Sequence, residues 1–130
     1  MPKYLLLLVA LLWTSIVSYF CLVQSNDLPV INIQNLDKYI HVFFHFVFTF
    51  VWFLFLYKHL KIGSIFRPLL TSFLLSFVFG IIIEILQGLV TTTRSADVMD
   101  GVANVTGATL AVVLVIICSK YNILNIILKN

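Results

Sequence analysis

"RPLLTSFLLSFVFGIIIEILQGLV", residues 67–90, is a run of 24 residues with only two charged side chains, Arg67 at its start and Glu84 near its end. A helix needs about 20 apolar residues to cross the hydrocarbon of a bilayer. This run is therefore long enough to span a membrane, and the question is whether the rest of the chain follows the same pattern.

Three further apolar runs of spanning length occur, at residues 4–23, 38–57 and 101–119, with polar segments between them at 24–37, 58–66 and 91–100. The chain is 62% hydrophobic and 10% charged, whereas soluble domains contain about 25% charged residues. The sequence therefore predicts a single all-α domain, residues 1–130, that forms a transmembrane four-helix bundle. The amphipathic tail, 120–130, is expected to prolong the fourth helix or to lie on the membrane surface.

The sequence gives one further expectation for each of the first two helices. The first apolar run continues to Val23 without a small-x-small cleavage site, which favours a retained helix over a cleaved signal peptide. The aromatic run from Phe43 to Tyr57 is expected to face lipid.

The basic residues predict the orientation of the bundle. Six of them fall on one side of a four-helix serpentine: Lys3, Lys58, Lys61, Arg67, Lys120 and Lys129. Only Lys38 and Arg94 fall on the other side. Both termini are therefore expected to be cytoplasmic, in a multi-pass protein of a cytoplasmic membrane. The scattered basic residues exclude a nucleic-acid partner and leave the lipid bilayer as the expected surroundings.

Polar residues gather at the outer level of this topology. The second helix begins with Asp37 and Lys38, and His41 and His45 follow on one face, because residues four apart are neighbours on a helix. The third and fourth runs add Glu84, Gln87, Arg94, Asp97, Asp100 and Asn104. These side chains are expected to form one polar pocket that opens to the outer leaflet.

Glu84 is the most informative of them, because it lies about 9 Å below Val90 along the helix axis. An ionised acid near the centre of a bilayer costs about 2–3 kcal/mol on insertion scales, so Glu84 should face protein or water. Small residues repeat every fourth position beside it, at Ser76, Gly80 and Gly88. A matching stripe in the fourth run comprises Asp97, Asp100, Asn104, Gly107 or Ala108, and Ala111. The two stripes predict that the third and fourth helices pack together.

The expected pocket has a formal charge of −2 when both histidines are neutral, so it should attract a cation or a proton. Simpler roles are open for each member. Asp97 and Asp100 can cap the fourth helix, and Arg94 can neutralise an acid. Glu84 and Gln87 can form hydrogen bonds between helices, and the histidines can be packing residues.

Three segments together, "DKYIH", "EILQ" and "RSADVMDGVANVTGA", resemble the VanZ-like family of small bacterial membrane proteins. The family pattern maps onto Asp37, Lys38, His41, Glu84, Gln87, Arg94, Asp97, Asp100, Asn104 and Gly107. The resemblance covers about residues 5 to 118. His45 departs from it, because the family is expected to have Tyr or Phe there, so no family role passes to this histidine.

The resemblance implies a cell-envelope protein related to one associated with low-level teicoplanin resistance, although resistance itself is not assigned to this chain. The sequence then predicts binding of an envelope lipid headgroup or a lipid-linked cell-wall precursor, with Arg94 and Lys38 holding a phosphate. One alternative is a membrane-embedded enzyme acting on a lipid headgroup, with His41 or Glu84 as general base. A divalent cation such as Mn²⁺ or Zn²⁺ would then be held by His41, Asp97 and Asp100. The other alternative is a purely structural bundle, and self-association into a homo-oligomer is left open.

Overall fold

The computed structural model describes the whole chain except residues 1, 24–26, 28–32, 62, 93–94 and 129–130. The described residues form five helices in succession: α1 (Lys3–Leu22), α2 (Leu36–Leu60), α3 (Phe66–Val90), α4 (Val98–Lys120) and α5 (Ile123–Leu128). The first four are long and apolar enough to cross a membrane. The predicted all-α transmembrane four-helix bundle is therefore confirmed.

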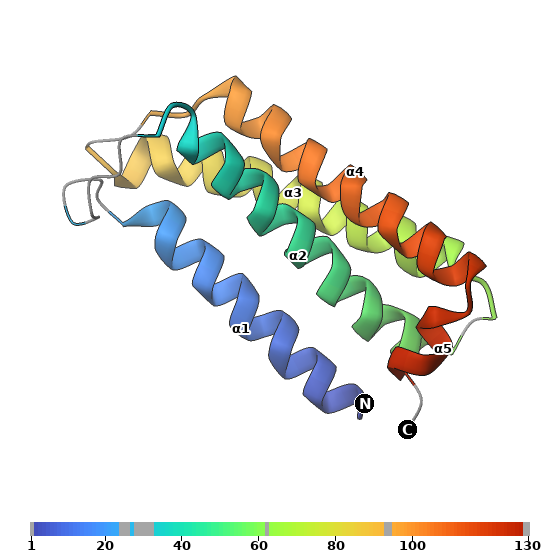
Figure 1. Cartoon of the computed structure of the whole chain (residues 1–130). Coiled ribbons are helices and arrows are strands. Elements are labelled where there is room, and N and C mark those ends of the chain that lie inside the picture. The colour runs from blue at the N-terminus through green and yellow to red at the C-terminus, as the bar shows by residue number, and fades with distance from the viewer. Residues whose placement is uncertain (1, 24–26, 28–32, 62, 93–94, 129–130) are drawn as a thin grey trace.

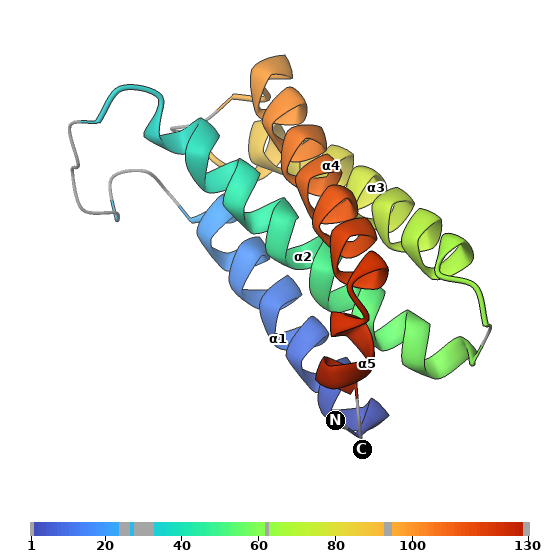
Figure 2. The same cartoon turned by 45° about the vertical axis from the view of Figure 1, so that its right-hand side comes forward.

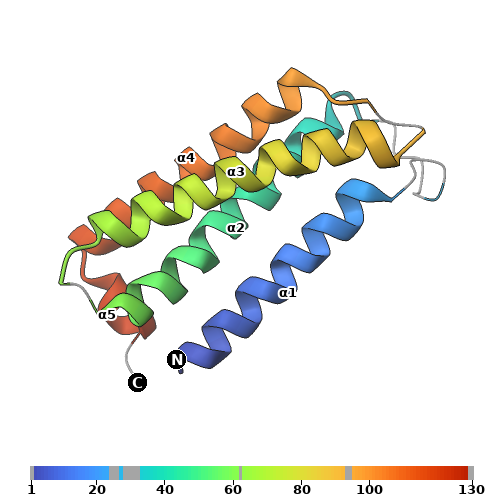
Figure 3. The same ribbon diagram turned by 180° about the vertical axis from the view of Figure 1, so that it is seen from behind.

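The four long helices run up and down, so the start of α1 and the end of α4 lie at the same end of the bundle (Figure 1). Most contacts of α4 are with α2, and α3 packs against both. The first helix lies along α2 and α3, on the side of the bundle away from α4 (Figures 2 and 3). The outer surface carries many exposed leucine, isoleucine, valine and phenylalanine side chains, as expected where lipid surrounds a bundle.

Helix α1 is fastened to α2 by two indole groups. Trp13 Nε1 donates to the carbonyl oxygen of Phe44 at 3.0 Å, and Trp52 Nε1 donates to Thr14 Oγ1 at 3.2 Å. A buried indole needs such a partner, because an unpaired N–H in an apolar setting is costly. The aromatic residues of α2 therefore do more than face lipid.

The expectation that the whole aromatic run of α2 faces lipid is wrong. Phe48 and Phe53 are 4% and 0% exposed. The Phe48 ring stacks on Phe79 of α3, with the ring centroids 4.7 Å apart. The run is long enough to cover more than one face of the helix, so part of it packs against neighbouring helices.

The C-terminal tail forms a separate helix. The fourth helix ends at Lys120, and Asn122 takes a left-handed backbone conformation with φ 56° before α5 begins. Leu124 is buried in the same cluster as Leu6 and Phe53. The tail therefore does not prolong α4 but packs against the end of the bundle where α1 begins.

Candidate functional site

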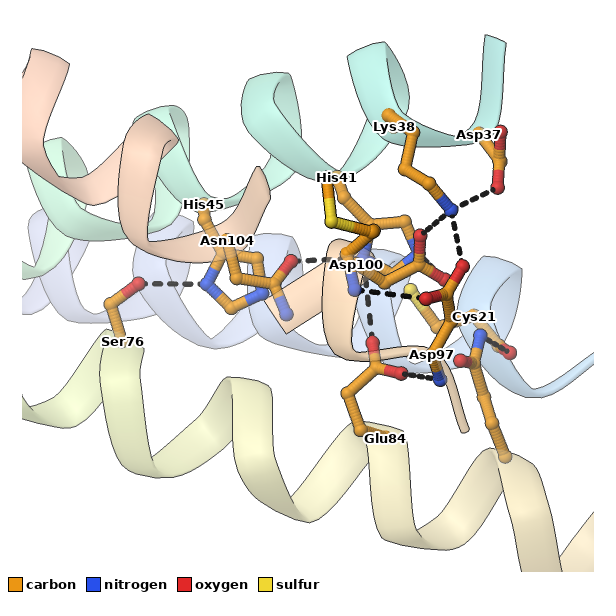
Figure 4. Close-up of polar contacts among 12 residues, drawn as sticks. Cys21, Asp37, Lys38, His41, His45, Ser76, Glu84, Asp97, Asp100 and Asn104 are labelled. Atoms are coloured by element: carbon orange, nitrogen blue, oxygen red, sulfur yellow. Dashed lines mark hydrogen bonds and ion pairs between the residues drawn. The ribbon is translucent and has the colours of Figure 1, made fainter. Parts of the chain in front are cut away.

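The polar cluster lies at the other end of the bundle, where α2 begins, α3 ends and α4 begins (Figure 4). Helix α4 begins at Val98, three residues before the predicted start, because the Asp97 side chain caps it by accepting from Met99 N at 2.8 Å. Asp100 consequently lies in the first turn of α4, and its side chain is only 10% exposed. The capping role expected for Asp97 is present in this geometry.

Lys38 is the hub that joins α2 to α4. Its Nζ donates to Asp37 Oδ2 at 3.0 Å, to Asp97 Oδ2 at 2.6 Å and to Asp100 Oδ1 at 2.5 Å. An ammonium has three N–H donors, so the three carboxylates use all of them. The Lys38 side chain is 24% exposed, which makes these ion pairs partly shielded from water.

The Lys38 contact changes the acidity of Asp97, which lies just outside α4. The hydrogen bond from Lys38 and, after it, the one from the Met99 backbone hold the pKa of the Asp97 carboxyl below its ordinary value of 3.8. A carboxyl whose pKa is lower in the folded state stabilises the fold above its ordinary pKa, and this contribution is lost as the pH falls through the folded value.

A pH series with Asp97→Asn tests this linkage. Asparagine still caps a helix, so the substitution removes the charge and leaves the cap. We expect wild type to be more stable than Asp97→Asn at neutral pH, and the difference to shrink as the pH falls below about 4. Thermal unfolding in detergent at a series of pH values measures it. A difference that stays constant over the whole series would contradict the linkage.

His41 lies directly below Lys38 and is 4% exposed. Its Nδ1 is 2.9 Å from Asn104 Oδ1, and because that oxygen can only accept, Nδ1 carries the proton. The other ring nitrogen, Nε2, is 3.8 Å from Asp100 Oδ2, and Glu84 Oε1 is 3.8 Å from His41 Nδ1. Three helices therefore contribute ionisable groups to one point.

Glu84 reaches this point from α3. Its Oε2 accepts from the Asp97 backbone N–H at 3.3 Å, while its Oε1 is buried without a hydrogen-bond partner among the described residues. One possible ligand atom each from His41, Glu84 and Asp100 lies within 4.8 Å of the other two. Asp97, which the sequence analysis placed in the metal set, is not part of this group, because its two oxygens serve the helix cap and Lys38.

One residue of the predicted set, Gln87, stands apart from the cluster. Gln87 is 2% exposed and faces α1, where its Nε2 donates to the carbonyl oxygen of Cys21 at 2.7 Å. It therefore forms the expected kind of interhelical hydrogen bond, but away from His41. Arg94 lies outside the described residues, so the predicted phosphate contact of Arg94 is not described by the structure.

A second polar layer below the cluster was not predicted from the sequence. His45 is 1% exposed and its Nδ1 is 2.8 Å from Ser76 Oγ. A Cβ on Gly80 would lie 3.0 Å from Asn104 Nδ2 and 3.1 Å from His45 Cε1, so a side chain at this position would crowd both groups. Ser76 and Gly80 belong to the small-residue stripe, and that spacing was the available signal.

A groove runs along α3 and α4 from the cluster into the apolar part of the bundle. It has a volume of about 710 Å³ and its wall is almost entirely apolar. The polar side chains at its outer end are Glu84, Asp97 and Asn104. Its apolar lining includes Phe77, Ile81, Ile85, Val102, Val105 and Leu110. The groove is therefore apolar along most of its length and has charged side chains at its outer end.

The described cluster is anionic. Among the described residues it contains one ammonium, of Lys38, and four carboxylates, of Asp37, Glu84, Asp97 and Asp100, which gives a formal charge of −3 when His41 is neutral. Such a site favours a cation and repels an unaccompanied anion.

A family model described as VanZ/LLP1 matches residues 3–119, which include α1 to nearly the end of α4 and every predicted site residue. The match confirms the resemblance seen in the sequence motifs. No curated protein and no solved structure matches the chain.

Proposed function

The chain belongs to the VanZ/LLP1 family, and on that premise we propose that it binds an envelope lipid headgroup or a lipid-linked cell-wall precursor at the outer ends of α2, α3 and α4. One observation carries the proposal: an apolar groove of about 710 Å³ ends at ionisable side chains. Ligand sites are concave and mostly apolar, with a few polar groups that fix the orientation of the ligand.

The shape of the groove suits an amphiphile. An acyl or prenyl chain would lie against Ile81, Ile85 and Val105, while the headgroup would lie beside Glu84 and Asn104. In a bilayer such a ligand enters sideways from the leaflet and keeps its chain in hydrocarbon, so binding requires little dehydration of apolar surface. A purely structural role would require the polar groups to be hydrogen-bonded to one another, whereas Glu84 Oε1 has no hydrogen-bond partner among the described residues and is 3.8 Å from His41 Nδ1.

The proposal places the protein in a bacterial cytoplasmic membrane, with both termini cytoplasmic and the cluster on the outer side. The cytoplasmic end would then carry Lys58, Lys61 and Arg67, in agreement with the positive-inside rule. Residues 61–65 and 91–97 lie at opposite ends of α3, so one cysteine in each segment distinguishes the two orientations.

Cysteine labelling in intact cells tests this orientation. A cysteine at Thr92, which is exposed, should react with a membrane-impermeant thiol reagent, and a cysteine at Ser64 should react only after permeabilisation. The native Cys21 and Cys118 are buried, so they give a low background. The reverse pattern of labelling would contradict the orientation.

Filling the groove tests the binding function. We expect Val105→Trp, which places an indole in the groove, to lower retention of bound lipid at least tenfold in native mass spectrometry. Val113→Trp is the matched control, because Val113 is on the same helix, is 48% exposed and does not line the groove. Equal retention by both variants would contradict the proposal.

Two probes separate the two ligand sources. Phosphatidylglycerol represents a lipid headgroup, and undecaprenyl diphosphate represents the lipid-linked precursors. Both carry phosphate next to a long apolar chain, which is the chemistry that the groove fits. The ligand source is identified by the probe that the wild type retains at the lower concentration and that the Val105→Trp variant fails to retain.

A further inference from the structure

We propose that His41, Glu84 and Asp100 bind one divalent cation, and that this cation receives the phosphate of the ligand in the groove. The second half of this inference rests on the proposed function. The three residues come from α2, α3 and α4, and their side chains are 4%, 12% and 10% exposed. The proposed ion would therefore lie inside the bundle, between these three side chains (Figure 4). Glu84 also lines the polar end of the groove.

The spacing of the three residues suits a metal ion. Ligand atoms lie about 2.0–2.2 Å from a bound Zn²⁺, so two ligands of one ion are at most about 4.4 Å apart. His41 Nε2 and Asp100 Oδ2 are 3.8 Å apart, within that limit. One atom from each of the three residues lies within 4.8 Å of the others. Glu84 Oε1 lies 3.8 Å from His41 Nδ1, so coordination by Nε2 requires the Glu84 carboxylate to rotate along the edge of the ring toward Asp100.

In each of the three side chains, one polar atom is held by a hydrogen bond to a neighbouring residue, and a second polar atom is left for the proposed ion. Asp100 uses Oδ1 for Lys38 and turns Oδ2 toward His41. Glu84 uses Oε2 for the Asp97 backbone N–H, and its buried Oε1 has no hydrogen-bond partner among the described residues. A carboxylate oxygen buried without a donor is costly, and a cation would compensate that cost.

The histidine is held in the same way. Asn104 Oδ1 accepts from His41 Nδ1–H, which leaves the lone pair of Nε2 on the side of Asp100. Metal-bound histidines usually donate their other ring N–H to a carbonyl or carboxylate, which fixes both the tautomer and the ring orientation. Asn104 is 3% exposed and supplies this partner from α4.

The charge of the cluster explains why a phosphate would need the ion. Arg94 and Lys38 were expected to hold the phosphate. Arg94 lies outside the described residues, and three carboxylates already accept from the Lys38 ammonium. A phosphate would have to displace one of them and would meet the remaining negative charge. A divalent cation beside Glu84 and Asn104 offsets that charge and leaves open positions toward the groove.

The donor set indicates which metals fit. Two carboxylates and one imidazole favour Mn²⁺ or Zn²⁺, whereas soft thiolate-preferring ions are disfavoured. Manganese is the better probe, because its electron paramagnetic resonance signal distinguishes free from bound ions.

The experiment uses full-length protein in detergent, treated with EDTA and then titrated with Mn²⁺. We expect one Mn²⁺ per chain in the wild type, and an affinity at least tenfold lower in Glu84→Gln and in Asp100→Asn. Asp27→Asn is the matched control, because it removes an exposed carboxylate outside the cluster and should leave Mn²⁺ affinity unchanged. Circular dichroism before the titration confirms that each variant is folded.

A further variant covers the case in which loss of a carboxylate unfolds the protein. Asn104→Ala removes only the partner that orients His41, and we expect it to weaken Mn²⁺ binding about 10–100-fold. Absence of stoichiometric Mn²⁺ binding to wild type would overturn the metal site. Equal affinity in Asp27→Asn, Glu84→Gln and Asp100→Asn would also overturn it.

A second arm separates this inference from the proposed function. Phosphatidylglycerol retention by the wild type is measured with Mn²⁺ and with EDTA, and we expect at least a tenfold loss in EDTA. Equal retention in EDTA would overturn the bridging role of the ion, while the lipid-binding function would stand. Mn²⁺ binding without any lipid retention would support the metal site and contradict the lipid-binding function.

Discussion

Gly107→Ala is expected to destabilise the bundle by about 3 kcal/mol, near the top of the range for overpacked cores. A Cβ at this position would collide with the carbonyl oxygen of Val42 and would lie 3.0 Å from Phe46 N, both backbone atoms of α2. A backbone cannot rotate away as a side chain can, so α2 and α4 would have to separate along the most extensive interface of the bundle. Thermal unfolding in detergent and abundance in membranes both measure the loss.

Gly101→Ala is the matched control on the same helix. A Cβ there has nothing within 4 Å, and alanine in a helix is more stable than glycine by roughly 0.5–1 kcal/mol. We therefore expect this variant to be as stable as the wild type or slightly more stable. Similar unfolding temperatures for the two alanine variants would show that α2 and α4 do not approach each other as described.

Lys38→Met is expected to cost about 2–3 kcal/mol, somewhat less than the ~3–5 kcal/mol lost when one partner of a fully buried ion pair is removed. The reduction reflects the 24% exposure of the Lys38 side chain. Without its ammonium, the Asp100 carboxylate is 90% buried beside three other acids and has lost its charge partner. Unfolding in detergent at neutral pH measures the effect.

A double variant shows whether the charge causes the loss. Lys38→Met combined with Asp100→Asn removes both the ammonium and its most buried partner, so we expect part of the stability to return. Additive losses in the double variant would mean that Lys38 acts through packing of its aliphatic stem, and would contradict the role of Lys38 as the hub.

The number and placement of the membrane helices could be predicted from the sequence, because the length of an apolar run depends on the bilayer and not on the neighbouring helices. The sequence could not predict which of these helices pack against each other. The stripe on α4 predicted packing against α3, and the two helices do touch, but Gly107 of that stripe faces Val42 of α2. Small residues permit close approach by any neighbour, so a stripe indicates a packed face without naming its partner.

The candidate site shows the same limit. Periodicity placed Lys38, His41, Glu84 and Asp100 at one depth, and the structure brings these four together. Periodicity could not show that Gln87 turns toward Cys21, because a helix can face two neighbours within one turn. Nor could it show that Glu84 takes the place of Asp97 in the proposed metal set, since that depends on which oxygens Lys38 and the helix cap already use.

The most direct test of the account is where a photoreactive phosphatidylglycerol, with a diazirine on its acyl chain, attaches to the protein in a lipid nanodisc. We predict that peptide mapping finds attachment concentrated at groove residues such as Ile81, Ile85 and Val105, with much less at Leu12 or Val113, which are exposed elsewhere on the surface. Attachment spread evenly over all exposed apolar residues would contradict a lipid site at the outer ends of α2, α3 and α4.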